Sequence, residues 1–257
     1  MLNLSIFDLL VPVFVLLLAI LYLPVTLLLL LKDGKFSELS SWTSFEKAWF
    51  SRFWSFFGMA SRALFAPDVE KVLSAAHGVV LDIGTGSGDW IYLFSEERNS
   101  NISKLYLVEP NTAFHPDLQK RVREYGLQEK CQIVRRTEDL KDYGVQHGSV
   151  DTISTVHVLC SVAAPDSLVR LLYSYLRHGG QWLVYEHVKA SNKWSVAGAW
   201  QAGINTVWPL CLDGCSMTRD TKETLLHNCK WTSTNLRPGS NEGRFNPLPH
   251  IVGVLVK

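Results

Sequence analysis

The chain has 257 residues, with 25 Lys or Arg against 24 Asp or Glu and a formal net charge of +1. Because the basic residues form no run, the composition argues against a nucleic-acid-binding surface. The length suits one α/β domain with a sizeable core and one short accessory segment, not two domains.

The N-terminal segment is the most apolar part of the chain. Residues 9–31 carry no charge, and a helix of that length, at about 1.5 Å per residue, just spans a hydrocarbon core of about 30 Å. We therefore expect a membrane anchor over residues 1–35. A cleaved signal peptide fits less well, because no Lys or Arg precedes the run and no small-x-small cleavage site follows closely.

The form of the anchor stays open, as Pro24 falls inside the apolar run. A proline there could kink a spanning helix or turn it into a shallow hairpin in one leaflet. Four basic residues follow the run and none precedes it, which predicts that the rest of the chain faces the cytosol. These residues are Lys32, Lys35, Lys47 and Arg52.

An aromatic segment, "WTSFEKAWFSRFWSFFGMASRALF", occupies residues 42–65. Its Trp and Phe pairs recur at helical spacing with basic residues between them, a pattern typical of an interfacial amphipathic helix. We assign residues 36–70 to such an amphipathic, aromatic linker helix. The segment also fits a first helix packed on the domain core, and the two interpretations are compatible.

From residue 79 onward, apolar runs bounded by turn signals alternate with helix-like segments. The expected strands are 79–83, 105–109, 131–135, 150–156 and 181–186, and segments such as 116–125 and 165–176 suit helices. This alternation predicts an α/β fold with a doubly wound, mainly parallel sheet over residues 71–257.

The first strand runs into a glycine-rich turn in "VVLDIGTGSGDW", with Gly84, Gly86 and Gly88. In a doubly wound sheet this turn lies where a cofactor binds, and glycines allow close approach of the backbone. The spacing is G-x-G-x-G and not the G-x-G-x-x-G of dinucleotide-binding proteins. The turn therefore argues against NAD or FAD.

With Asp82 two residues before the first glycine, this turn resembles motif I of the class I S-adenosylmethionine-dependent methyltransferases. The resemblance implies a Rossmann-like, seven-stranded sheet and S-adenosylmethionine as cofactor. Glu109, in "LYLVEPN", stands where these enzymes place an acid that accepts hydrogen bonds from both ribose hydroxyls.

Further motifs follow in the order that this class requires. "RRTEDL" aligns with the segment that contacts adenine, which implies contacts from Thr137 and Glu138. Arg136 stands where many relatives carry an acid, so the backbone is expected to make much of the adenine contact. "GSVDTISTVHVLCSV" matches the fourth-strand motif and adds Val156 to the cofactor-binding residues, and "LRHGGQWLVYEHV" matches the fifth strand.

The motifs "HVLCSV", "YEHV", "DGCSMTR" and "PHIVGVLVK" resemble a small membrane-anchored methyltransferase-like family that includes alkyl-thiol S-methyltransferases of the endoplasmic reticulum and lipid droplets. The resemblance implies S-methylation of a small lipophilic thiol by a membrane-bound protein at one of those locations, with its catalytic domain facing the cytosol. Two alternatives remain open. One is O- or N-methylation of a lipophilic metabolite, and the other is a catalytically silent, membrane-tethered scaffold at lipid droplets.

Candidates for accepting the thiol proton are His157, His187, His250 and Glu186. His187 ranks first because it lies in a family motif, although a hydrogen-bonded core position is the competing interpretation for each histidine. Glu186 and His187 are expected near the mouth of the pocket. Residues 194–215, aromatic and apolar, are expected to form a cap over the acceptor, with ordinary helix packing as the alternative.

The cysteines indicate neither a disulfide framework nor a metal site. Five are present, an odd and sparse set that indicates a reducing compartment: Cys131, Cys160, Cys211, Cys215 and Cys229. The C-x-x-x-C pair of Cys211 and Cys215 lacks a second Cys or His pair, so both are expected to be packing residues. The expected partners are thus a small lipophilic substrate and a lipid membrane, with no nucleic acid and no metal.

Overall fold

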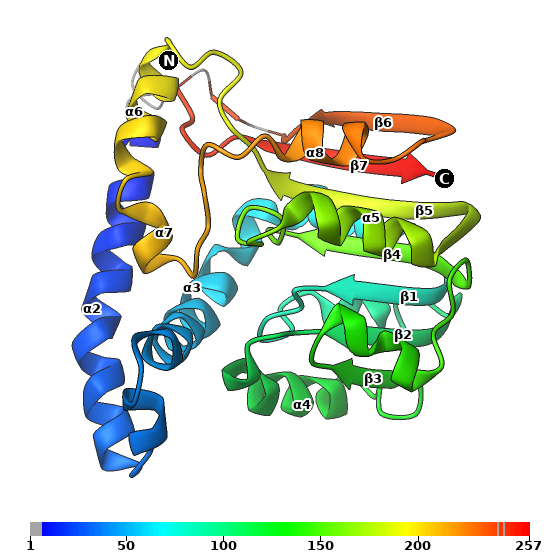
Figure 1. Cartoon of the computed structure of the whole chain (residues 1–257), viewed down its shortest axis with the longest axis horizontal. Coiled ribbons are helices and arrows are strands. Elements are labelled where there is room, and N and C mark those ends of the chain that lie inside the picture. The colour runs from blue at the N-terminus through cyan, green and yellow to red at the C-terminus, as the bar shows by residue number, and fades with distance from the viewer. Residues whose placement is uncertain (1–6, 241, 244) are drawn as a thin grey trace.

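The computed structural model describes residues 7–240, 242–243 and 245–257, so the first six residues of the expected anchor lie outside it. Its centre is a seven-stranded sheet of order β3-β2-β1-β4-β5-β7-β6 (Figure 1). The strands are β1 Gly78–Ile83, β2 Ile102–Val108, β3 Cys131–Val134, β4 Val150–Val156, β5 Leu176–His187, β6 Ser233–Pro238 and β7 His250–Val256. Only the pairs β5–β7 and β6–β7 are antiparallel. The predicted doubly wound, mainly parallel sheet is confirmed.

Helices precede the sheet and alternate with its strands. They are α2 Val11–Lys32, α3 Trp42–Leu73, α4 His115–Glu124, α5 Pro165–Tyr175, α6 Val196–Ile204, α7 Trp208–Cys211 and α8 Thr221–His227. Four 3-10 turns complete the order: η1 Phe36–Leu39, η2 Ile91–Phe94, η3 Thr112–Phe114 and η4 Thr137–Tyr143.

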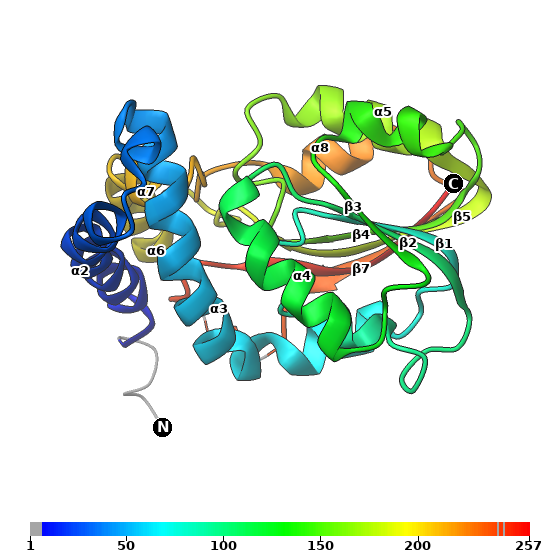
Figure 2. The same cartoon turned by 90° about the horizontal axis from the view of Figure 1, so that it is seen from below.

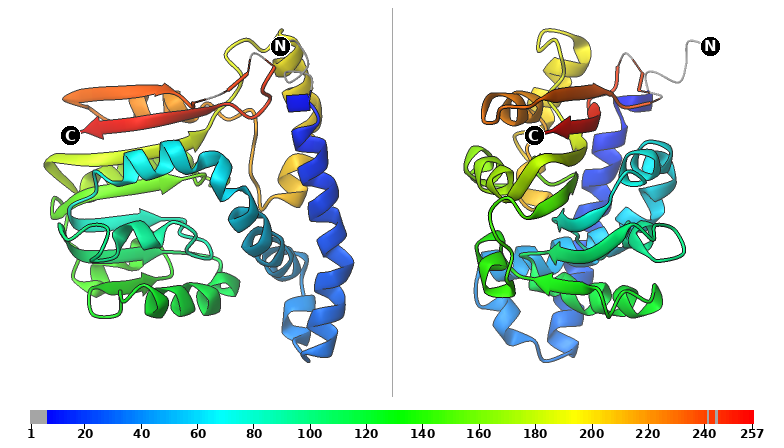
Figure 3. Two further views of the ribbon diagram at one scale, coloured as in Figure 1. Left: turned by 180° about the vertical axis from the view of Figure 1, so that it is seen from behind. Right: turned by 90° about the vertical axis from the view of Figure 1, so that its right-hand side faces the viewer.

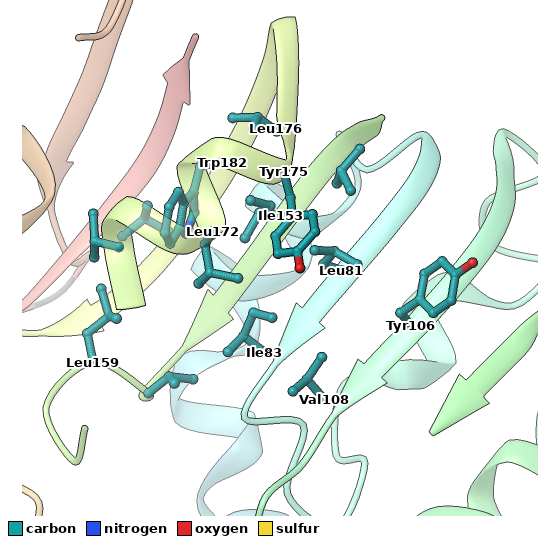
Figure 4. Close-up of a cluster of buried hydrophobic side chains, with 14 of the residues drawn as sticks. Leu81, Ile83, Tyr106, Val108, Ile153, Leu159, Leu172, Tyr175, Leu176 and Trp182 are labelled. Atoms are coloured by element: carbon teal, nitrogen blue, oxygen red, sulfur yellow. The ribbon is translucent and has the colours of Figure 1, made fainter. Parts of the chain in front are cut away.

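Successive side chains of each strand point to opposite faces of the sheet, and a hydrophobic core lies on each face. Leu81 and Trp182 belong to the core beneath α5 and α8 (Figure 4), and Val80 and Leu183 to the core beneath α4 and the end of α3. The view from below shows the sheet between these two helical layers (Figure 2). Because neighbouring side chains of a strand point to opposite faces, near-continuous apolar strands are what a sheet covered on both faces requires.

Helix α3 joins the sheet to the N-terminal helix. Ser41 caps its start by accepting a hydrogen bond from the Ser44 N–H at 3.2 Å. The end of α3 packs on the sheet, and its beginning contributes Trp49 and Phe53 to a third core with α2, α6 and α7. The expected aromatic helix is therefore continuous with a core helix, and it runs past the expected boundary at residue 70.

Helix α2 is unbroken at Pro24, so the chain does not form a hairpin there. It lies alongside α6 and α7 (Figure 3). Two indole N–H groups donate to backbone carbonyls of this segment at 2.7 Å, Trp49 to Ala19 within the helix and Trp200 to Leu9 just before it. Among the described residues, α2 is the one helix that is long and apolar enough to cross a membrane.

The Trp49 hydrogen bond provides a test of how α2 is attached. Trp49→Phe keeps an aromatic ring but removes the buried donor, so we expect a loss of about 1 kcal/mol and a fall in Tm of about 2–4 °C. The measurement is thermal unfolding by circular dichroism in mild detergent. Trp194→Phe is the matched control, because Trp194 is 84% exposed. An equal fall in both variants would contradict a specific role for the Trp49 bond.

Candidate active site

A large cavity lies at the carboxyl edge of the sheet, between the sheet, α2 and α3. Its volume is about 920 Å³, near the upper end of the range for small-molecule pockets. Polar groups from the loops after β1 and β2 line one part, here called the polar end, and apolar residues of α2, α3 and α7 line another, here called the apolar end. Charged residues from the segments of those helices, Asp8, Lys47 and Asp213, also line the cavity. The cavity therefore suits a polar ligand beside an apolar one.

The glycine turn forms the floor of the polar end. Gly86 has a φ of +59°, and a Cβ added to it would meet nothing closer than the Trp54 indole at 3.8 Å. A Cβ on Gly84 or Gly88 would instead lie within 3 Å of Val158 or Leu118. Gly86 thus faces open space that a ligand can fill, whereas the other two glycines are required by packing within the protein.

Asp82 lies behind this turn and does not line the large cavity among the described residues. Its Oδ1 accepts a hydrogen bond from the Ser154 hydroxyl at 2.7 Å, and its backbone carbonyl accepts one from Thr85 at 3.1 Å. Burial raises the pKa of the Asp82 carboxyl to about 6. The residue borders a small adjoining void of about 40 Å³ and ties β1 to β4.

Glu109 follows β2 and bridges two loops. One carboxylate oxygen accepts from the Gly86 N–H and the other from the Asn111 N–H, each at 2.7 Å. Burial raises the pKa of Glu109 to about 7, although both N–H groups lower it. Since a carboxylate can accept about four hydrogen bonds, Glu109 keeps acceptor sites free toward the cavity.

The other expected cofactor-binding residues also line the cavity. Thr137 and Glu138 begin η4, with Thr137 buried and Glu138 exposed. Val156 ends β4 beside the glycine turn. Arg136, which departs from the family pattern, is exposed and forms an ion pair with Asp139 at 2.6 Å.

Three histidines meet at the far side of the glycine turn. The rings of His157 and His250 lie 5.0 Å apart, and those of His187 and His250 lie 5.8 Å apart. His187 and His250 are directly paired in the β5–β7 register, and all three line the cavity. The fold therefore brings together the three histidines that the motifs single out.

Their surroundings make two of these histidines weak bases. Burial lowers the pKa of His250 to about 3 and holds that of His157 well below its ordinary value. The His250 Nδ1 lies 2.8 Å from the Glu242 carboxyl, whose pKa burial raises to about 7. His157 Nε2 is buried without a hydrogen-bond partner and can accept a bond from a ligand.

Glu186 does not lie at the pocket mouth, so this expectation is wrong. The side chain is completely buried, and its oxygens accept hydrogen bonds from the backbone N–H groups of Val158 and Leu159 at 3.1–3.2 Å. Because neighbouring residues of a strand point to opposite faces, Glu186 turns away when His187 turns toward the cavity. Glu186 holds the loop that follows β4.

Sequence reasoning missed the role of α3 in the site. Trp54, Phe57 and Phe65 line the cavity, as does Val15 of α2. The helical spacing of the aromatic residues was a usable signal, but it indicates an apolar face without indicating what that face covers. Glu242, which pairs with His250, had no local signal at all.

The segment expected to form a cap contributes to the apolar end through Trp208 and Leu212. It also brings Cys215 close to two residues that are distant in sequence. The ligand atoms of Cys160, His187 and Cys215 all lie within 4.8 Å of one another. The contact between the two thiols raises the pKa of Cys160 and lowers that of Cys215. Cys215 is thus a cavity residue and not only a packing residue.

Known proteins share both the sequence pattern and this architecture. The profile of the methyltransferase domain family matches residues 59–228. The chain is 29% identical to thiol S-methyltransferase TMT1B of Homo sapiens over 97% of this chain and 100% of that protein. It is 31% identical to thiol S-methyltransferase TMT1A of Homo sapiens over 73% of this chain and 77% of that protein.

Solved structures share the fold at low sequence identity. An O-methyltransferase family protein from Burkholderia thailandensis superposes with a TM-score of 0.62 at 11% identity, covering 92% of this chain and 71% of that one. PigF, solved with SAH, superposes with a TM-score of 0.59 at 19% identity, covering 84% and 62% of the two chains. From its motifs, its fold and these relatives, the chain belongs to the methyltransferase domain family and is an S-adenosylmethionine-dependent methyltransferase.

Proposed function

We propose that this methyltransferase transfers the methyl group of S-adenosylmethionine to a small lipophilic thiol while attached to a membrane. The observation that carries the proposal is the single cavity whose polar end meets the glycine turn and whose apolar end is walled by α2, α3 and α7. The relatives named thiol S-methyltransferase support a sulfur acceptor.

The polar end fits the cofactor. Gly86 leaves open space above the turn, and Glu109 has free acceptor sites for two ribose hydroxyls. Thr137 and Glu138 border the place for the adenine, and Val156 ends the strand nearest the methyl donor. Asp82 and Gly88 lie behind the glycine turn and stabilise its conformation. When bound, the cofactor supplies an electrophilic methyl group on a sulfonium.

The walls of the other end favour a lipophilic acceptor. They include Val11 and Val15 of α2, Phe57 of α3, and Trp208 and Leu212 from the cap segment. Apolar walls exclude water from the acceptor and hold its reactive atom close to the methyl group, which is the main contribution that orientation makes to such a displacement.

The ease with which the acceptor ionises favours a thiol over an alcohol as the substrate. A thiol has an ordinary pKa of about 8.5 and is a few per cent ionised at neutral pH, so little help is needed to form the nucleophile. An alcohol needs a strong base. Burial lowers the pKa values of His157 and His250, which makes both weaker bases. His157 Nε2 can still accept a hydrogen bond from a thiol and orient it.

The two faces of α2 support attachment in the plane of the membrane and not across it. The exposed stripe of α2 is wide: besides Phe14, Leu17, Leu21 and Leu28 it includes Ile20, Val25, Leu27 and Leu29. The opposite stripe is covered by protein along the helix: Pro12, Val15, Ala19, Thr26 and Leu30 are buried. A spanning α2 would draw the charged residues of α3 into the hydrocarbon, which is unfavourable. The exposed stripe can instead enter one leaflet.

The acceptor class is tested with a thiol, an alcohol and an amine that share one short alkyl chain. We expect turnover of the thiol to exceed that of the alcohol by at least about 100-fold, because the thiol ionises far more readily. Methyl transfer from labelled cofactor measures all three. Comparable rates for the alcohol or the amine would overturn the S-methylation proposal.

The role of Glu109 is tested through pH. Ribose hydroxyls bind the ionised carboxylate better than the acid, so the affinity for S-adenosylmethionine should fall about tenfold from pH 8 to pH 6, through the Glu109 pKa of about 7. Glu109→Gln should weaken binding at pH 8 by about tenfold or more and flatten this dependence. Calorimetry measures both, with the exposed Glu129→Gln as control. An unchanged pH dependence in Glu109→Gln would show that another group titrates.

The orientation of α2 is tested with an epitope tag before residue 1 and a second tag after residue 257. An in-plane helix leaves both tags on the cytosolic side, so protease added to intact microsomes should remove both while a lumenal marker survives. Protection of the N-terminal tag alone would show that α2 spans the bilayer.

A further inference from the structure

Three side chains with metal-binding atoms converge on the apolar side of the cavity. Cys160 lies in the loop after β4, His187 ends β5, and Cys215 follows α7. Their sulfur and nitrogen atoms all lie within 4.8 Å of one another. Ligands of a tetrahedral zinc ion, bound at about 2.0–2.3 Å, are separated by about 3.5–3.8 Å. The upper bound of 4.8 Å is close to the spacing that a bound zinc ion requires.

His187 is the clearest sign that this cluster receives a ligand. The residue is 4% exposed, and neither ring nitrogen has a hydrogen-bond partner among the described residues. A buried imidazole normally has a hydrogen-bond partner, since a buried polar atom without one destabilises the fold. The Cys160 sulfur contacts the Cys215 thiol and the His187 ring, and its other contacts are long, 3.8 Å to the His157 carbonyl and 3.7 Å to the Ser161 hydroxyl.

Hydrogen bonds to backbone carbonyls hold the three segments together without involving the side chains of Cys160, His187 and Cys215. The Ser216 N–H donates to the Cys160 carbonyl at 2.9 Å, which joins the segments of the two cysteines. The Thr221 hydroxyl donates to the His187 carbonyl at 3.0 Å, and Arg219 donates to carbonyls of the loop after β4. A site built in this way is already arranged before a ligand arrives.

The donor set indicates the ion. Two thiolates and one imidazole form a soft set that suits zinc, and three protein ligands with a fourth position left open are the arrangement of catalytic zinc sites. All three residues line the cavity, so the open position faces the space for the acceptor.

We propose that Cys160, His187 and Cys215 bind one zinc ion whose fourth position takes the sulfur of the acceptor. This inference rests on the proposed thiol S-methylation. Binding to the ion releases the thiol proton to solvent through the cavity mouth. The thiolate sulfur then forms a bond to the methyl carbon as the bond from that carbon to the sulfonium breaks, which yields a thioether and S-adenosylhomocysteine. The ion keeps its charge, and no oxidant or reductant is needed.

Metal content of the full-length chain, purified in mild detergent, is the first test. We expect about one zinc per chain, measured by mass spectrometry of the elements. Cys215→Ala and His187→Ala should lower this content at least about tenfold. Cys211→Ala is the matched control and should keep its zinc, because Cys211 lies near Cys215 in sequence but outside the cluster. Calorimetry with S-adenosylmethionine checks that each variant still folds.

Cobalt replacement tests the open position. The parent chain loaded with Co²⁺ should show the thiolate-to-cobalt charge-transfer absorption of a tetrahedral site, and a short alkyl thiol, but not its alcohol, should change that spectrum. This measurement needs no variant and no turnover.

The outcomes separate the two proposals. A parent chain that methylates the thiol yet binds neither zinc nor cobalt, or that contains a Cys160–Cys215 disulfide, overturns the metal site and leaves the proposed function standing. A chain that binds zinc through these three residues but methylates no thiol supports the metal site and overturns the proposed function.

Discussion

The parallel pairing of β1 with β2 and β4 is the constraint on which the site depends. Parallel neighbours end at the same edge of a sheet, so the residues that follow each strand meet there. The register places Asp82 beside Ser154 and Ile83 beside Val108. As a result the glycine turn, Glu109 and His157 surround one cavity, although they come from three separate loops. A rigid sheet thereby positions groups that no single loop could hold.

Helix α3 contributes much of the apolar lining of this cavity. Its end packs on the sheet, and its beginning packs on α2, so one helix connects the cofactor side to the apolar N-terminal helix. Its aromatic side chains, Trp54 and Phe57 among them, line the cavity. The glycine turn and the apolar N-terminal helix therefore border the same cavity.

Burial moves several of the titratable groups around the cavity toward their neutral forms. It raises the pKa of Glu109 and of Glu242 to about 7 and lowers that of His250 to about 3. Exclusion of water suits thiol methylation, because a sulfonium cation and a thiolate anion combine to give two neutral products. Their attraction is stronger where water is excluded. The neutral imidazole of His157 also leaves the lone pair of its buried Nε2 free to accept a hydrogen bond.

Local patterns in the sequence determined much of the fold and of the cofactor end. Apolar periodicity located β1 to β5 to within a few residues at most boundaries, and the glycine turn with Glu109 indicated the class of enzyme, because backbone conformation and burial are encoded locally. Other features were decided only by the tertiary structure. They include the continuity of α2 at Pro24, the burial of Glu186, the pairing of Glu242 with His250, and the convergence of Cys160, His187 and Cys215. These depend on how segments far apart in the chain pack against one another, and neither spacing nor periodicity within a short segment carries that information.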